Sequence, residues 1–185
     1  YTNTIDFVTI ATTGNASDFG DLLNFNPSFP ATCSSSTRGI IAGGEGPSPH
    51  PYFDNIEFVT IASTGNGTDF GNLLAANFSL GGSSSPTRGI FGGGAAPGSI
   101  NVIQFITIAT TGDATDFGDL TLARSYVSGC SSHIRGVFGG GNTPSNVNNI
   151  DFVTIATTGN ASDFGDLIEG RESLRASSNS HGGLE

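Results

Sequence analysis

Oxygen-bearing side chains recur at a fixed spacing in four copies of one segment, which reads TIATTGNASDFGDL at residues 9–22. Each copy holds three of them: Asn15, Asp18 and Asp21; Asn66, Asp69 and Asn72; Asp113, Asp116 and Asp119; and Asn160, Asp163 and Asp166. Carboxylate and amide oxygens are the ligands that Ca²⁺ prefers, but EF-hand-like loops place them at every second residue and this segment at every third. We therefore expect these side chains to cap turns and strand ends, and we expect no metal or other cofactor.

Arginine recurs in a second repeated segment, which reads TRGIIAGG at 37–44. Arg38, Arg88 and Arg135 hold the same place in three copies, and the fourth copy has no Arg at 182. An Arg in a chain this acidic usually binds a carboxylate or the backbone carbonyls of an adjacent strand. We expect a structural role, in which each Arg forms a buried ion pair with one Asp of the DFGD-type segments: Asp18, Asp69, Asp116 or Asp163. A ring of arginines that binds an anion is the alternative.

Cysteine and histidine form no pattern that is typical of a catalytic site. Cys33 and Cys130 each lie five residues before a repeated Arg, and we expect free thiols rather than a disulfide. His50, His133 and His181 share no close spacing, and the chain has no HExxH, GxSxG or phosphate-binding loop. We expect a protein that is not an enzyme.

Composition and charge narrow the classes of partner. The 185 residues carry a formal net charge of −10, with 16 acidic and 6 basic residues and no basic stripe, so we expect no nucleic-acid partner. No apolar run approaches the ~18 residues of a membrane span, so we expect no membrane insertion. The length suits one domain over residues 1–185, and because the chain begins at Tyr1 we expect a processed product or part of a longer protein.

The repeat predicts the fold. Phe7, Phe58, Phe105 and Phe152 lie 51, 47 and 47 residues apart, which gives repeat units of approximately 5–55, 56–102, 103–149 and 150–185. Each unit holds an alternating strand such as 5–12, a turn, a short strand around Phe19, a strand of small residues before the Arg, and the Arg-Gly strand. Gly20 marks a bulge or a close backbone approach, and the small residues suit a crowded axis. We predict an all-β chain with four short strands in each period.

These segments resemble the kelch-type β-propeller repeat. RGIFGGG at 88–94 resembles the strand that ends in a double glycine, VIQFITI at 102–108 resembles the strand that follows, and LARS at 122–125 stands near the family's arginine before the innermost strand. The wording of the repeat is also similar to that of kelch-like, tail-fibre-like structural proteins of marine cyanobacterial phages. The resemblance implies a propeller of four blades, closed by a blade that residues 5–22 share with residues around 174–184. A part of a larger propeller, or a ring completed by oligomerisation, is the alternative.

Function is expected where the copies differ, since identical segments in every repeat are what a stacked scaffold needs. The clearest difference is the longer loop that contains His50, Tyr52, Phe53 and Asp54, which we predict as a ligand-binding site; 25–29 and 125–127 also differ. The resemblance implies a non-enzymatic binding or structural module of a virion appendage, located in the virion or outside the cell. Its partner would be a host-surface glycan or protein, or a neighbouring virion subunit. A multivalent lectin is the alternative.

Overall fold

The computed structural model describes residues 2–23 and 27–178, and all of their regular structure is strand. Sheet 1 contains β1 (Thr4–Phe7) and β2 (Ser17–Asp21). Sheet 2 contains β3 (Ala31–Ser34), β4 (Arg38–Ala42), β5 (Asn55–Thr60) and β6 (Thr68–Asn72). Sheet 3 contains β7 (Gly81–Ser84), β8 (Arg88–Gly92), β9 (Val102–Thr107) and β10 (Thr115–Asp119). Sheet 4 contains β11 (Ser128–Ser131), β12 (Arg135–Gly139), β13 (Asn149–Thr154) and β14 (Ser162–Asp166).

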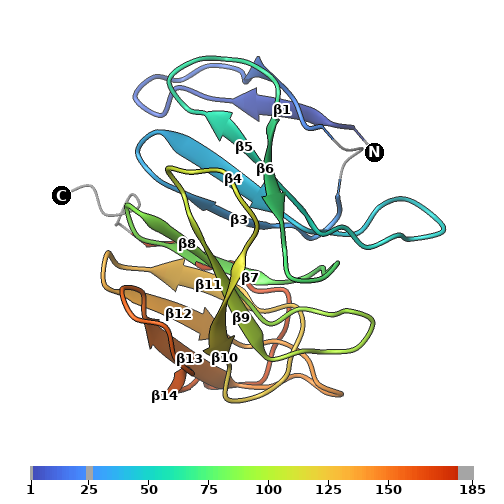
Figure 1. Cartoon of the computed structure of the whole chain (residues 1–185), viewed down its shortest axis with the longest axis vertical. Coiled ribbons are helices and arrows are strands. Elements are labelled where there is room, and N and C mark those ends of the chain that lie inside the picture. Colours follow the sequence, from blue (N-terminus) through green and yellow to red (C-terminus); the bar gives the residue numbers. More distant parts are fainter. Residues whose placement is uncertain (1, 24–26, 179–185) are drawn as a thin grey trace.

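Each sheet is an antiparallel meander in which neighbours in the sequence pair in space. Figure 1 shows sheet 1 at one end of the long axis and β13 and β14 of sheet 4 at the other. The described part of the chain contains no helix that could cross a membrane. The predicted all-β class and the repeated four-stranded unit are therefore confirmed.

Strand β7 lies against both β3 and β11, as the small residues of these strands predict. A Cβ atom added at Gly82 of β7 would come within 2.2 Å of the Thr32 carbonyl oxygen of β3. One added at Gly129 of β11 would come within 2.3 Å of the Gly82 carbonyl oxygen. The backbones approach too closely for larger residues, so the predicted crowding where these strands converge is confirmed.

The core lies between successive sheets, because the faces of neighbouring sheets pack against each other. One buried cluster joins Ile56 and Phe70 of sheet 2 to Phe91 and Ile108 of sheet 3. A second joins the matching residues of sheets 3 and 4, among them Phe117 and Phe138. The alternation read from the sequence is thus confirmed, although the strand predicted at 5–12 ends earlier, at Phe7.

The glycine of each DFG segment serves the contact between sheets. At Gly71 the ladder between β5 and β6 shifts its register, and the residue has a φ of +144°. An added Cβ would lie 2.5 Å from the Gly112 backbone of sheet 3. Gly20 and Gly118 repeat this geometry, so both the predicted bulge and the predicted close approach occur together.

Closure of the four sheets into a ring stays a prediction. Among the described residues β1 pairs with β2 alone, and no further strand joins sheet 1. Part of the predicted shared blade, residues 179–184, and the variable position Phe25 lie outside the described residues.

Candidate functional site

The repeated Asn and Asp oxygens cap strand ends of the preceding sheet. Asp113 Oδ1 accepts a hydrogen bond of 2.9 Å from the Asn72 N–H. Asn66 and Asn160 do the same for the N–H groups of Asp21 and Asp119, each at 3.1 Å. The predicted strand-end capping is confirmed for these three turns, and it links neighbouring sheets.

The prediction that the repeated arginines pair with DFGD aspartates is wrong. Arg38 instead lies over the Phe58 ring, 4.2 Å from its centroid, and donates a 2.7 Å hydrogen bond to the Ile108 carbonyl of sheet 3. Arg88 lies over Phe105 and donates to the Ile155 and Ala156 carbonyls of sheet 4. Arg135 lies over Phe152 in the same way.

Neither these arginines nor the aspartates Asp18, Asp69, Asp116 and Asp163 take part in an ion pair within the described residues. The four aspartates are exposed, so water solvates them and a buried pair is not required. Each Arg lies on an aromatic face, and Arg38 and Arg88 also donate to carbonyls of the next sheet. The partners of these arginines are therefore aromatic rings and carbonyls rather than the predicted aspartates.

A second repeated acceptor stands beside the DFG segment and joins each sheet to the one before it. Glu57 Oε2 and Gln104 Oε1 each accept a 2.8 Å hydrogen bond, from the N–H groups of Leu23 and Leu74. Asp151 accepts from the N–H and the hydroxyl of Thr121, at 3.0 and 2.7 Å. All three acceptors are buried, so each of the three contacts between successive sheets contains one such polar side chain.

In the described part of the chain, only one of these acceptors has a buried cation. Arg124 Nη1 lies 3.0 Å from Asp151 Oδ2, and both side chains are fully buried. Arg124 also donates to the Phe138 carbonyl. The sequence shows Arg124 in the LARS segment but does not show that it forms an ion pair. The one available signal for the pair is Asp151, which stands where the previous repeat has Gln104.

No described residue supplies such a cation to Glu57, which affects the pH dependence of stability. Its Oε1 has no hydrogen-bond partner among residues 2–23 and 27–178. Burial raises the pKa of Glu57, the Leu23 N–H opposes this, and Asp69 adds to the rise. The folded state therefore binds a proton at this carboxyl more tightly than the unfolded state does. The stability that Glu57 contributes is complete below its unfolded pKa of ~4.3 and is lost as the pH rises through the folded pKa.

We expect Glu57→Gln to stabilise the fold at pH 7 by about 1–3 kcal/mol, because Gln keeps the acceptor for Leu23 without a buried charge. The gain should shrink to nearly nothing at about pH 3, more than one unit below the unfolded pKa, where Glu57 is protonated in both states. Urea unfolding of both proteins across this range measures it. Glu169→Gln, at an exposed site, is the control and should change little. An advantage of Glu57→Gln that stays constant with pH would contradict the account.

The predicted loop site is anchored to the molecule. His50 Nδ1 lies 3.1 Å from Glu45 Oε1, while Tyr52 stacks on Phe78 with centroids 4.7 Å apart. Phe53 is half-buried, and the Asp54 side chain is exposed while its carbonyl accepts from the Leu73 N–H. Of the four predicted residues, Tyr52 connects the loop to the rest of the candidate site.

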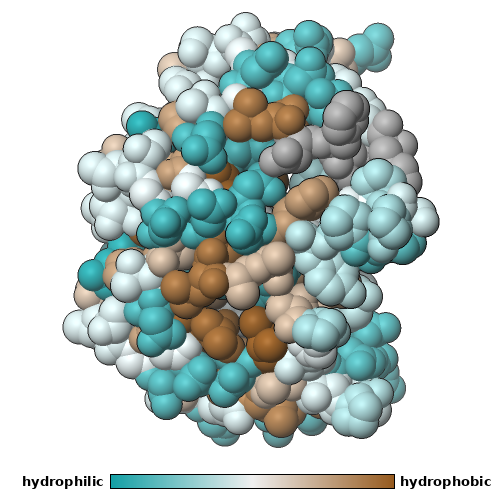
Figure 2. Space-filling model, turned by 45° about the vertical axis from the view of Figure 1, so that its right-hand side comes forward, coloured by the Kyte–Doolittle hydropathy of each residue, from teal (hydrophilic) through white to brown (hydrophobic). Residues whose placement is uncertain are grey.

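Aromatic rings from three variable segments meet at the loop end of the inner strands. Phe78 contacts both Tyr52 and Tyr126, and the Tyr126 ring lies edge-on to Phe29 at 5.6 Å. Phe29 and Tyr126 both have positive φ, 55° and 56°, and the Phe29 side chain is 46% exposed. We call Phe29, Tyr52, Phe78 and Tyr126 the aromatic cluster. Figure 2 shows the molecule turned so that the right-hand side of Figure 1 comes forward. In the middle of this surface, apolar side chains gather among hydrophilic ones.

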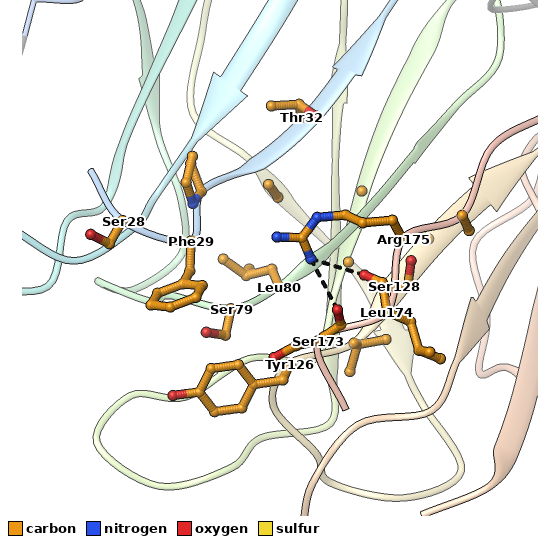
Figure 3. A pocket seen from close by; sticks show the side chains of 17 residues that line it. Ser28, Phe29, Thr32, Ser79, Leu80, Tyr126, Ser128, Ser173, Leu174 and Arg175 are labelled. Atoms are coloured by element: carbon orange, nitrogen blue, oxygen red, sulfur yellow. Dashed lines mark hydrogen bonds between the residues drawn. The ribbon is translucent and has the colours of Figure 1, made fainter. Parts of the chain in front are cut away.

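Phe29 and Tyr126 of the aromatic cluster line a pocket of about 460 Å³, which we call the axial pocket. The starts of β3, β7 and β11 and the segment 173–176 line it. Figure 3 shows the Phe29 and Tyr126 rings on one side and the Arg175 side chain extending into the pocket from the other. Arg175 Nη1 donates to the carbonyls of Ser173 and Leu174, at 3.4 and 2.9 Å. The site therefore offers aromatic faces, serine hydroxyls and one cation.

The two cysteines lie along the same axis. Cys33 and Cys130 are free thiols, as expected, and line a further cavity of about 490 Å³ next to the axial pocket. Burial raises the pKa of Cys33 to about 12 and also raises that of Cys130. Because the thiolate is the reactive form, both groups are poor nucleophiles at neutral pH.

Within residues 2–23 and 27–178, no three His, Cys, Asp or Glu side chains are grouped so that they could hold a metal ion. No protein-family model matches the chain, and a search of curated proteins finds no match.

Proposed function

We propose that the chain is a non-enzymatic binding module that recognises a carbohydrate, and in particular an acidic sugar, in the axial pocket. The observation that carries the proposal is the position of the aromatic cluster opposite Arg175. Sugar rings present apolar C–H faces, which pack on aromatic rings, and hydroxyls, which hydrogen-bond to serine side chains. A guanidinium binds a carboxylate in bidentate geometry. Among the described residues, the Arg175 guanidinium is the only cation that lines this pocket.

The repeated segment serves as scaffold in this proposal. Its side chains join the sheets, whereas the residues at equivalent places around the pocket differ: Phe29, Ser79, Tyr126 and Ser173. This difference supports one site on the axis over the several equal sites that a multivalent lectin would have.

The wider setting follows from the resemblance to kelch-like, tail-fibre-like proteins. We propose a β-propeller in a virion appendage or another extracellular position, where the axial pocket and its loops contact a host-surface glycan. The net charge of −10 fits this setting, because it disfavours nucleic acid.

Titration calorimetry with a uronic-acid oligosaccharide and its neutral counterpart tests the proposal. We expect the acidic sugar to bind more tightly, Phe29→Ala to weaken binding by about tenfold or more, and Arg175→Gln to remove the preference for the acidic sugar. Phe7→Ala is the matched control, since Phe7 is 41% exposed on sheet 1 and does not line the pocket. Equal effects of Phe29→Ala and Phe7→Ala, or no binding of either sugar, would overturn the proposal.

A further inference from the structure

Every junction between successive sheets uses the same four hydrogen bonds. Between sheets 3 and 4, the N–H groups of Gly159 and Ala161 donate to the carbonyls of Phe117 and Asp119, at 2.7 and 2.8 Å. In return the Asp119 N–H donates to Asn160 Oδ1, and the Thr121 N–H donates to Asp151 Oδ2. Equivalent groups make the same four bonds between sheets 2 and 3 and between sheets 1 and 2.

The outer faces of sheets 1 and 4 carry the same hydrogen-bonding groups without a neighbouring sheet among the described residues. Sheet 1 has the groups that the following sheet supplies at a junction, and sheet 4 has those that the preceding sheet supplies. Sheet 1 presents the N–H groups of Gly14 and Ala16 as donors. It presents the side chains of Asn15 and Asp6 as acceptors. Sheet 4 presents the Phe164 and Asp166 carbonyls and the Asp166 and Ile168 N–H groups. None of these eight groups has a hydrogen-bond partner within the described residues.

The apolar parts of the two faces are likewise uncovered. Phe164 of sheet 4 is 55% exposed, whereas its counterparts Phe70 and Phe117 are each 2% exposed. Ile10 of sheet 1 is 97% exposed, whereas its counterparts Ile108 and Ile155, which pack against four-stranded sheets, are each 1% exposed. The third counterpart, Ile61, faces the two-stranded sheet 1 and is 48% exposed. These two faces therefore have the composition of a buried junction and the exposure of a surface.

The backbone at Gly165 of sheet 4 has the conformation found at the formed junctions. It has a φ of +138°, close to the +144° of Gly71 and Gly118, which suits a seat for the turn of a following sheet. A Cβ added at Gly71 or Gly118 would lie 2.5 Å from that turn, whereas one added at Gly165 meets nothing within 4 Å. The seat is formed, and no described residue occupies it.

We propose that sheet 1 of a second copy of this chain docks on sheet 4 and forms a fourth junction with the same four bonds. All of the groups that the bonds need lie on the outer two strands and their turn, so the two-stranded sheet 1 has the complete set. Within these 185 residues the two faces lie at opposite ends of the long axis and do not meet (Figure 1), and the partner to which we assign them is a second copy, because the two faces of one copy carry complementary halves of the same junction. This inference goes beyond carbohydrate recognition and does not depend on the axial pocket.

The contact is heterologous, so successive copies form either a closed ring or an open filament. Two of its four bonds join backbone to backbone and two join a backbone N–H to a side chain, its other contacts are apolar, and each copy carries a net charge of −10. Salt screens the repulsion between copies, so assembly should increase with ionic strength.

Two variants, one for each face, test the junction by light scattering. Ile10→Asp disables the sheet 1 face and Phe164→Asp disables the sheet 4 face, each by placing a charge in the apolar part of the junction. Over about 1–500 µM the parent chain should form species larger than 18.8 kDa, and each variant alone should stay monomeric. An equal mixture has one intact junction, so it should give a dimer of roughly twice the chain mass and no larger species.

Controls keep the outcome interpretable. Leu74→Asp alters a side chain that is 51% exposed away from both faces, and it should assemble like the parent. Ile168→Asp, at a fully exposed position, replaces Phe164→Asp if that variant melts early. A parent that stays monomeric over the whole range, or a mixture that forms no dimer, would overturn the proposal.

Discussion

Arg124→Asn should lower the free energy of unfolding by about 3–5 kcal/mol, because it leaves the Asp151 carboxylate buried without its cation. Asp151 would keep its bonds to Thr121, but those cannot replace a full positive charge at 3.0 Å. Chemical denaturation of the purified variant measures the loss. A cost below about 1 kcal/mol would contradict the importance of the buried pair.

The chain supplies its own controls for this prediction. Sheet 3 has Asn77 and Gln104 at the places of Arg124 and Asp151, and both are buried. The double variant Arg124→Asn/Asp151→Gln should therefore recover most of the lost stability, since it removes both charges together. Arg171 holds the same place one repeat later, where it is 51% exposed beside Glu169; Arg171→Asn should cost less than about 1 kcal/mol.

Gly118→Ala should be as damaging, because two separate costs add. Its φ of +144° is a conformation that residues with a Cβ rarely adopt, which costs about 1–3 kcal/mol. The added methyl would also lie 2.5 Å from the Gly159 backbone, so sheet 4 would have to move away from sheet 3. Thermal and urea unfolding should show a loss of roughly 3–5 kcal/mol in total.

Gly165→Ala separates the two costs. Gly165 has nearly the same φ, +138°, and nothing within 4 Å of an added Cβ. In the monomer it should show the conformational cost alone, about 1–3 kcal/mol. Equal losses for Gly118→Ala and Gly165→Ala would mean that the close approach between sheets does not contribute to stability.

Much of the fold could be predicted from the sequence because the same pattern of residues occurs four times. Alternation in IDFVTI, glycine in each DFG segment and small residues before each Arg have local physical causes, and the structure bears out each of them. The bulge at Gly20 and the crowded axis at Gly82 follow from backbone geometry alone. Ring closure does not follow in this way, because it depends on contacts between segments more than 150 residues apart.

The side-chain partners were harder to predict, for a physical reason. A repeated Arg beside repeated aspartates favours an ion pair on charge alone, yet exposed carboxylates gain little from pairing and an aromatic face with a free carbonyl satisfies the Arg. The pair that does form, Arg124 with Asp151, occurs in one repeat only and joins residues 27 positions apart. Variable segments at Tyr52, Phe29 and Tyr126 were recognised singly, but only the fold brings their rings together.

The central claim is that the repeated segment is a scaffold whose polar atoms join each sheet to the next. Amide hydrogen exchange measures this directly, because bonded N–H groups exchange slowly. In dilute solution the account predicts slow exchange at Asn72, Leu74, Asp119 and Thr121, whose N–H groups are bonded to the following sheet, and fast exchange at the equivalent Asp166 and Ile168. Equally fast exchange at all of these positions would contradict it.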